Sequence, residues 1–104
     1  MDDEIIVIKN VRVVYITTKQ DRYNNEQAYF KIKDKNIEPK FSPIIKDGFN
    51  LPWFKSDKGQ YILKVKSKYV KLNEPKKDLP VIVDIDFKYY KMNDVEGHYV
   101  SSVV

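Results

Sequence analysis

The stretch QYILKVKSKYVKLNEPKKDLPVIVDIDFKYYK, residues 60–91, decides the predicted fold class, because it holds two segments with the two-residue period of a β-strand. In residues 60–71 apolar side chains alternate with lysines, and in residues 80–91 they alternate with charged or tyrosine side chains. Such alternation places apolar side chains on one face of a sheet and polar ones on the other. The linker, residues 72–80, contains two prolines and is too short for a crossover helix. The sequence therefore predicts that the two segments form an antiparallel hairpin.

Three further segments complete an all-β prediction. Residues 5–17 are β-branched almost throughout, residues 27–33 alternate, and residues 97–104 are rich in valine. Five strands without a required helix, in a single domain spanning residues 1–104, predict a small five-stranded antiparallel barrel of OB-fold type. Residues 34–59 form one long connection, and connections of that length are usually functional or contain a short element of their own.

The composition argues against catalysis. The chain has no cysteine and one histidine, His98, so no set of nucleophile, base and orienting residue can be assembled by a recognisable motif. Asp84 and Asp86 could share a strand face and bind a metal ion, but cross-strand pairing with the lysines of residues 60–71 is the more ordinary explanation. We therefore expect no enzyme activity, no cofactor and no metal site. The longest apolar run, Ile5 to Ile8, cannot span a membrane, and we expect a cytoplasmic location, that of the host cell if the protein is viral.

The net positive charge favours a polyanionic ligand. The formal net charge is +4, and nearly all the basic residues are lysines, with Arg12 and Arg22 the only arginines. Lysine acts on phosphate as a point charge, whereas arginine is the usual reader of bases. The excess of lysine over arginine favours contacts with the nucleic-acid backbone over recognition of the base sequence. A lysine-rich composition is also typical of proteins from AT-rich genomes, and that alternative stays open.

Two of the predicted strands carry cations and rings on their polar faces. Single-stranded nucleic acid is bound by a cationic groove with exposed rings on which bases stack. Lysines at every second position of residues 60–71 would recur about every 7 Å, near the phosphate spacing of an unstacked strand. The alternative is that these lysines form only the solvated face of a sheet and guard it against edge pairing. The candidate contact residues are Tyr29, Lys31, Lys33, Trp53, Phe54, Lys64, Lys66, Lys68 and Tyr90.

The long connection contains the chain's only tryptophan, within DGFNLPWFKSDKG, residues 47–59. Trp53 and Phe54 are adjacent, so in an extended chain they point in opposite directions. We expect Phe49 and Leu51 to cap one end of the barrel. Trp53 is then predicted to be the exposed ring and Phe54 the buried one.

Three stretches resemble the single-stranded-DNA-binding proteins of tailed phages, including the short-tailed ones. They are VIKNVRVVYITT (7–18), WFKSDKGQYILKVKSKYVKL (53–72) and LPVIVDIDFKYYKMNDVEGHYVSSVV (79–104). The resemblance implies an OB-type barrel that coats single-stranded DNA in phage replication or recombination, with phage replication proteins as further partners. It also implies that the candidate rings and lysines line the groove. Members of this family commonly have an acidic tail, and Asp2, Asp3 and Glu4 are one candidate for its screening role.

Two functions from different classes remain open on the sequence. The first is sequence-independent binding of single-stranded DNA, with RNA as an alternative ligand because the same rings stack on both. The second is a small phage or mobile-element effector that uses its basic surface to bind an acidic host protein. A coating protein would bind oligo-dT in a salt-dependent way, whereas an effector would ignore it. The oligomeric state is also open, with a homodimer as one alternative.

Overall fold

The computed structural model describes residues 4–73 and 75–104, so Asp2 and Asp3 lie outside the described part. The chain is mostly β-strand, with three short helical turns. The strands are β1 (Ile5–Gln20), β2 (Glu26–Ile32), β3 (Trp53–Lys55), β4 (Tyr61–Lys66), β5 (Pro80–Met92) and β6 (Val95–Val103). The helical turns are α1 (Ile37–Phe41) and the 3₁₀ turns η1 (Ser42–Ile44) and η2 (Ser67–Tyr69).

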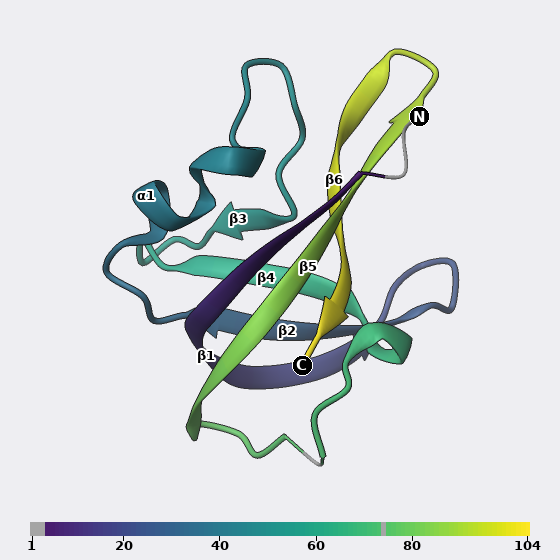
Figure 1. The fold of residues 1–104 in the computed structure, drawn as a ribbon. Coiled ribbons are helices and arrows are strands. Elements are labelled where there is room, and N and C mark those ends of the chain that lie inside the picture. Colours follow the sequence, from purple (N-terminus) through teal and green to yellow (C-terminus); the bar gives the residue numbers. More distant parts are fainter. Residues whose placement is uncertain (1–3, 74) are drawn as a thin grey trace.

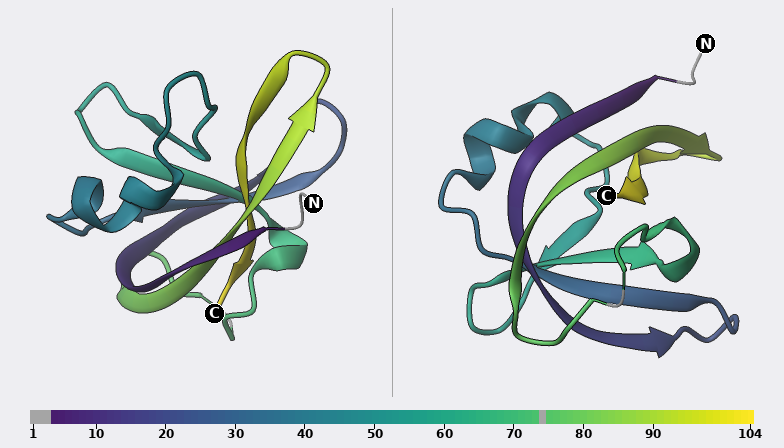
Figure 2. Two further views of the ribbon diagram at one scale, coloured as in Figure 1. Left: turned by 45° about the horizontal axis from the view of Figure 1, so that its top comes forward. Right: turned by 60° about the horizontal axis from the view of Figure 1, so that its bottom comes forward.

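All six strands belong to one sheet in the order β3-β4-β2-β1-β5-β6, and every ladder is antiparallel. The sheet curls into a half-barrel, with α1 at one end (Figure 1). The right-hand view of Figure 2 shows the long strands β1 and β5 curving around the interior. The four strands β4-β2-β1-β5 have the spatial order of a Greek key, since β5 returns to lie beside β1. The predicted all-β, barrel-like fold is confirmed, but with six strands rather than five.

The predicted hairpin between residues 60–71 and 80–91 is wrong. β4 pairs with β2 and β3, and β5 pairs with β1 and β6. The reason is the length of β1, whose first half pairs with β5 and whose second half pairs with β2. A bulge between Ile8 and Val11 bends β1, and its backbone at Asn10 has a φ of 60°. The Asp84 carboxylate accepts the Asn10 backbone N–H at 3.0 Å, so Asp84 supports this bulge instead of pairing with a lysine of β4.

The long connection, residues 34–59, contains α1, η1 and β3. The helix α1 is only five residues long, too short for a helical period to be visible in the sequence. Its Phe41 is fully buried and makes edge contacts with Trp53 at 5.0 Å and Phe87 at 5.7 Å between ring centroids. The connection therefore plugs one end of the barrel through Phe41 and Ile44, both without exposed surface.

The core lies inside the curl of the sheet. Its fully buried side chains come from the long strands and from the connection that plugs the barrel end. Burying each large apolar side chain contributes about 1.5–3 kcal/mol to stability. They are Val11, Val13, Phe30, Phe41, Ile44, Leu63, Val83, Ile85, Phe87 and Val103.

β4 and β6 face each other across a seam where no ladder joins them among the described residues. The seam is held at both ends. At one end the Lys71 N–H donates to the Val103 carbonyl at 2.8 Å. At the other end the Asn50 N–H donates to the Glu96 carbonyl at 2.9 Å, and the His98 N–H donates to the Asn50 carbonyl at 3.2 Å. The half-barrel is thus closed at two points and open between them. Within the described residues, no helix is long and apolar enough to cross a membrane.

Candidate nucleic-acid interface

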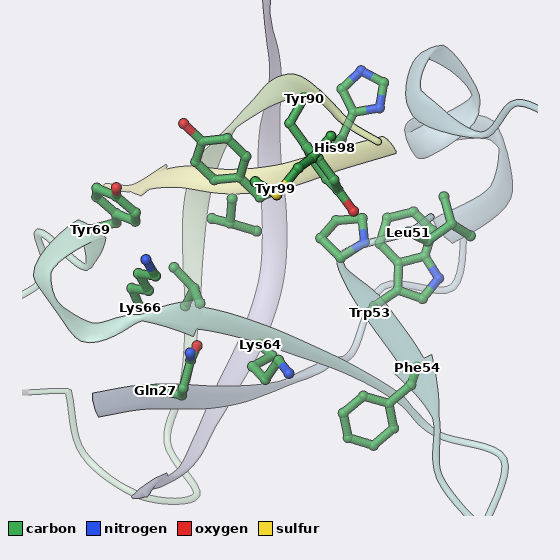
Figure 3. A pocket seen from close by; sticks show the side chains of 14 residues that line it. Gln27, Leu51, Trp53, Phe54, Lys64, Lys66, Tyr69, Tyr90, His98 and Tyr99 are labelled. Carbon is green, nitrogen blue, oxygen red and sulfur yellow. The ribbon is translucent and has the colours of Figure 1, made fainter. Parts of the chain in front are cut away.

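The seam between β4 and β6 forms a groove of about 610 Å³. Buried Val65 of β4 and Val100 of β6 belong to its lining. Figure 3 shows lysines entering from the β4 side and tyrosines from the β5–β6 side. The full lining is Gln27, Leu51, Pro52, Trp53, Phe54, Lys64, Val65, Lys66, Tyr69, Tyr90, Met92, His98, Tyr99 and Val100.

One wall carries Lys64 and Lys66. Their side chains are exposed because they alternate along β4 with Leu63 and Val65, which face the core. Two residues of strand separate them by about 6.8 Å, at about 3.4 Å per residue. No carboxylate is present among the fourteen residues that line the groove. The groove is therefore positively charged, as an anionic ligand requires.

The opposite wall carries Tyr90 of β5 and Tyr99 of β6, and Tyr69 of η2, the turn that follows β4, stands at the end of the groove next to Tyr99. We call these three residues the tyrosine row. The ring centroids of Tyr90 and Tyr99 are 6.2 Å apart, and those of Tyr99 and Tyr69 are 6.3 Å apart. Each ring is partly exposed, and Figure 3 shows the row running along the groove. The groove therefore offers flat apolar faces opposite its cations.

The far end of the groove carries Trp53 and Phe54, but their roles are the reverse of the prediction. Trp53 lies opposite Leu63 in the β3–β4 ladder, so it faces the interior and packs on Phe41. Phe54 lies opposite Ile62 and is 50% exposed. Because adjacent residues of a strand point to opposite faces, the register of this short ladder decides which ring is exposed. Both rings still belong to the groove lining.

The remaining predicted contact residues lie on the outer face of β2 or just beyond the end of a strand. Tyr29 lies directly opposite Lys64 on the outer face of the β2–β4 ladder, and the ammonium of Lys19 stands 5.8 Å from the centre of its ring. Lys31 lies on the same face of β2, while Lys33 follows the end of that strand. Lys68 does not continue the lysine row, because β4 ends at Lys66 and η2 begins. The expected third lysine of that row is therefore displaced.

A segment that we call the strap, residues 46–52, crosses from η1 to β3 and is fixed to β6 at Asn50. The contact depends on Gly97, because a Cβ there would lie 2.4 Å from the Asn50 carbonyl oxygen. The Asn50 side-chain Nδ2 also donates to the Tyr90 hydroxyl at 3.3 Å. The strap thus holds one end of the tyrosine row and leads directly into Trp53.

His98 lies beneath the strap. It is 3% exposed, and its ring contacts those of Phe49 and Tyr89, at centroid distances of 5.7 Å and 6.1 Å. Burial, with the charge of Lys46 as a second cause, lowers the pKa of His98 below its ordinary 6.5. The imidazole is therefore neutral at neutral pH, and its Nδ1 has no hydrogen-bond partner. His98 thus belongs to an aromatic cluster with Phe49 and Tyr89.

The sequence prediction missed Tyr69 and Tyr99 as site residues. For Tyr99 a signal existed, because the partly exposed Tyr99 and Ser101 alternate with the buried His98 and Val100 along β6. Tyr69 was expected on the core side with Leu63 and Val65, and its ring does pack against the core. It lies in η2, beyond the end of β4, and there it also lines the groove. Among the described residues, no three metal-binding side chains cluster.

Compared with known proteins, the chain matches no family model, no curated protein and no solved structure.

Proposed function

We propose that this protein binds single-stranded DNA in the groove between β4 and β6, without catalysis and with little dependence on sequence. One observation carries the proposal: a row of lysines and a row of tyrosines face each other across one open groove. Single strands are bound by this pairing of cations for the backbone and rings for the bases. From the resemblance to phage proteins we further propose that it coats single strands during phage replication or recombination.

The composition of the groove supports binding rather than chemistry. Its only imidazole, His98, is buried beneath the strap, and no carboxylate belongs to its lining. General acid–base catalysis needs a titratable group within reach of the substrate. Weak sequence preference follows from the residue types, because stacking tolerates every base and lysine contacts phosphate.

The effector alternative accounts for the lysines but not for the tyrosine row. An acidic protein would engage the ammonium groups of Lys64 and Lys66, and it has no need of three partly exposed rings that follow one another along the groove. Stacked bases use both features. The same groove accepts RNA bases, so RNA is a second ligand to be measured rather than a separate function.

The test compares two double variants that lose the same charge. Lys64→Ala/Lys66→Ala removes the lysines of the groove, and Lys9→Ala/Lys76→Ala removes two exposed lysines outside it. On a single strand each neutralised phosphate contributes about 0.7 to the slope of log affinity against log salt. We expect the groove variant to bind oligo-dT more weakly with a slope shallower by about 1.4, while the control keeps the wild-type slope.

Both double variants should melt as wild type does, since all four side chains are exposed. Equal binding by the two variants would show that the lysines act only through net charge, and it would contradict the groove as the site.

A further inference from the structure

We infer that the groove holds three successive nucleotides in a fixed register, with one base against each of Tyr90, Tyr99 and Tyr69. This inference rests on the proposed function and assigns the register of the bound strand. The rings repeat at 6.2 Å and 6.3 Å. An unstacked strand spaces its nucleotides at about twice the ~3.4 Å repeat of a stacked one, which is about 7 Å. The row therefore repeats at nearly the interval of an extended single strand.

The bases lie on the ring faces that border the groove and do not slide between neighbouring rings. A base between two parallel rings needs them about 7 Å apart, twice the ~3.4 Å stacking distance. The centroids are closer than that, and the planes are inclined by 53° for Tyr90 and Tyr99 and by 39° for Tyr99 and Tyr69. No parallel slot exists between adjacent rings. Each tyrosine can then serve only one base, and three tyrosines serve three.

The lysine wall has a matching number of cations. Three successive nucleotides are joined by two phosphates, and the groove lining contains two lysines, Lys64 and Lys66. Their separation along β4 is about 6.8 Å, again close to one nucleotide of an extended strand. Lys68 does not add a third position, since its ammonium lies 5.3 Å from the centre of the Tyr69 ring, outside the lysine row.

Both ends of the row are held before any ligand arrives. The Tyr90 hydroxyl accepts a hydrogen bond from Asn50, and the Tyr69 ring is flanked by the Lys68 ammonium. Rings that are already in place lose less conformational freedom on binding, so more of the stacking free energy appears as affinity. Beyond the row stands Trp53, whose ring is packed against Phe41 and does not extend the row.

The test measures affinity against length for unphosphorylated oligo-dT, from thymidine upward. For the wild type we expect a gain of about tenfold or more with each added nucleotide up to the third, and only a few-fold per nucleotide after that. Tyr69→Ala removes an end position, so its steep gain should stop at the second nucleotide, while thymidine keeps two of its three positions and loses less than about twofold in affinity. Tyr69→Phe keeps the ring and should follow the wild type. Tyr23→Ala, a 71% exposed tyrosine outside the groove, is the matched control.

Two results would overturn the register. One is a wild-type length dependence with no break at the third nucleotide. The other is a Tyr69→Ala variant that loses the same factor for thymidine and for the trinucleotide, because a ring without a fixed position would act on every length alike. Absence of binding at any length would instead contradict the proposed function itself.

Discussion

Trp53 and Phe54 show how a single register position decides the role of a residue. The two rings are neighbours in the chain, yet one packs on Phe41 in the interior and the other is half exposed. The sequence predicts correctly that they point in opposite directions, but it cannot say which one faces inward. That choice follows from the pairing of Trp53 with Leu63, and the β3 strand that makes this pairing is only three residues long.

We predict that Trp53→Ala destabilises the fold and that Phe54→Ala does not. Trp53→Ala should lower the free energy of unfolding by about 3 kcal/mol, at the lower end of the range for a core aromatic because the ring is only partly buried. Phe54→Ala should melt as wild type, since its ring is half exposed. Urea denaturation and calorimetry measure both effects. Loss of folding in Phe54→Ala alone would reverse the assignment.

At the scale of elements, the strands are predictable from alternation and their partners are not. The alternating period of residues 60–71 and 80–91 correctly indicates two half-buried strands, and the short linker between them favours a hairpin. The structure pairs β5 with β1 instead, because β1 runs for 16 residues and a bulge lets it serve two neighbours. The bulge depends on Asn10 with a positive φ and on the Asp84 carboxylate, 74 residues away in sequence. Contacts between such distant residues leave no periodic signal.

The strap is the element whose position matters most for the groove. It reaches β6 only because Gly97 has no side chain, and it fixes the Tyr90 hydroxyl through Asn50. We predict that Gly97→Ala detaches the strap, because backbone atoms of Asn50 cannot give way as a flexible side chain could. Hydrogen exchange of the His98 amide should accelerate, and the melting temperature should fall, by an amount equivalent to about 1–3 kcal/mol.

A suitable control for Gly97→Ala is Ser102→Ala, which lies farther along β6. It should leave the exchange of His98 unchanged. Slow exchange at His98 in Gly97→Ala would mean that the strap tolerates the added methyl group, and the proposed dependence of the groove on this contact would be wrong.

For the whole molecule, the curl of the sheet produces both the half-barrel and the groove. The sheet curls far enough for β4 to face β6, and among the described residues backbone hydrogen bonds bridge the seam at two points, Asn50 and Lys71. What the sequence could predict of the site was its chemistry, lysines and rings on strand faces. It could not predict that Lys64 and Lys66 would face Tyr99 and Tyr69, because that arrangement depends on which strands border the seam.

We expect this seam to bind a single strand and not a duplex. The most direct measurement is a fluorescence-anisotropy titration with labelled oligo-dT longer than the groove and with a duplex of the same length, each at low and at high salt. We predict that the single strand binds more tightly, because a duplex hides the base faces that the tyrosine row requires, and that the affinity falls as salt rises. Equal affinity for the duplex, or an affinity for oligo-dT that does not change with salt, would contradict it.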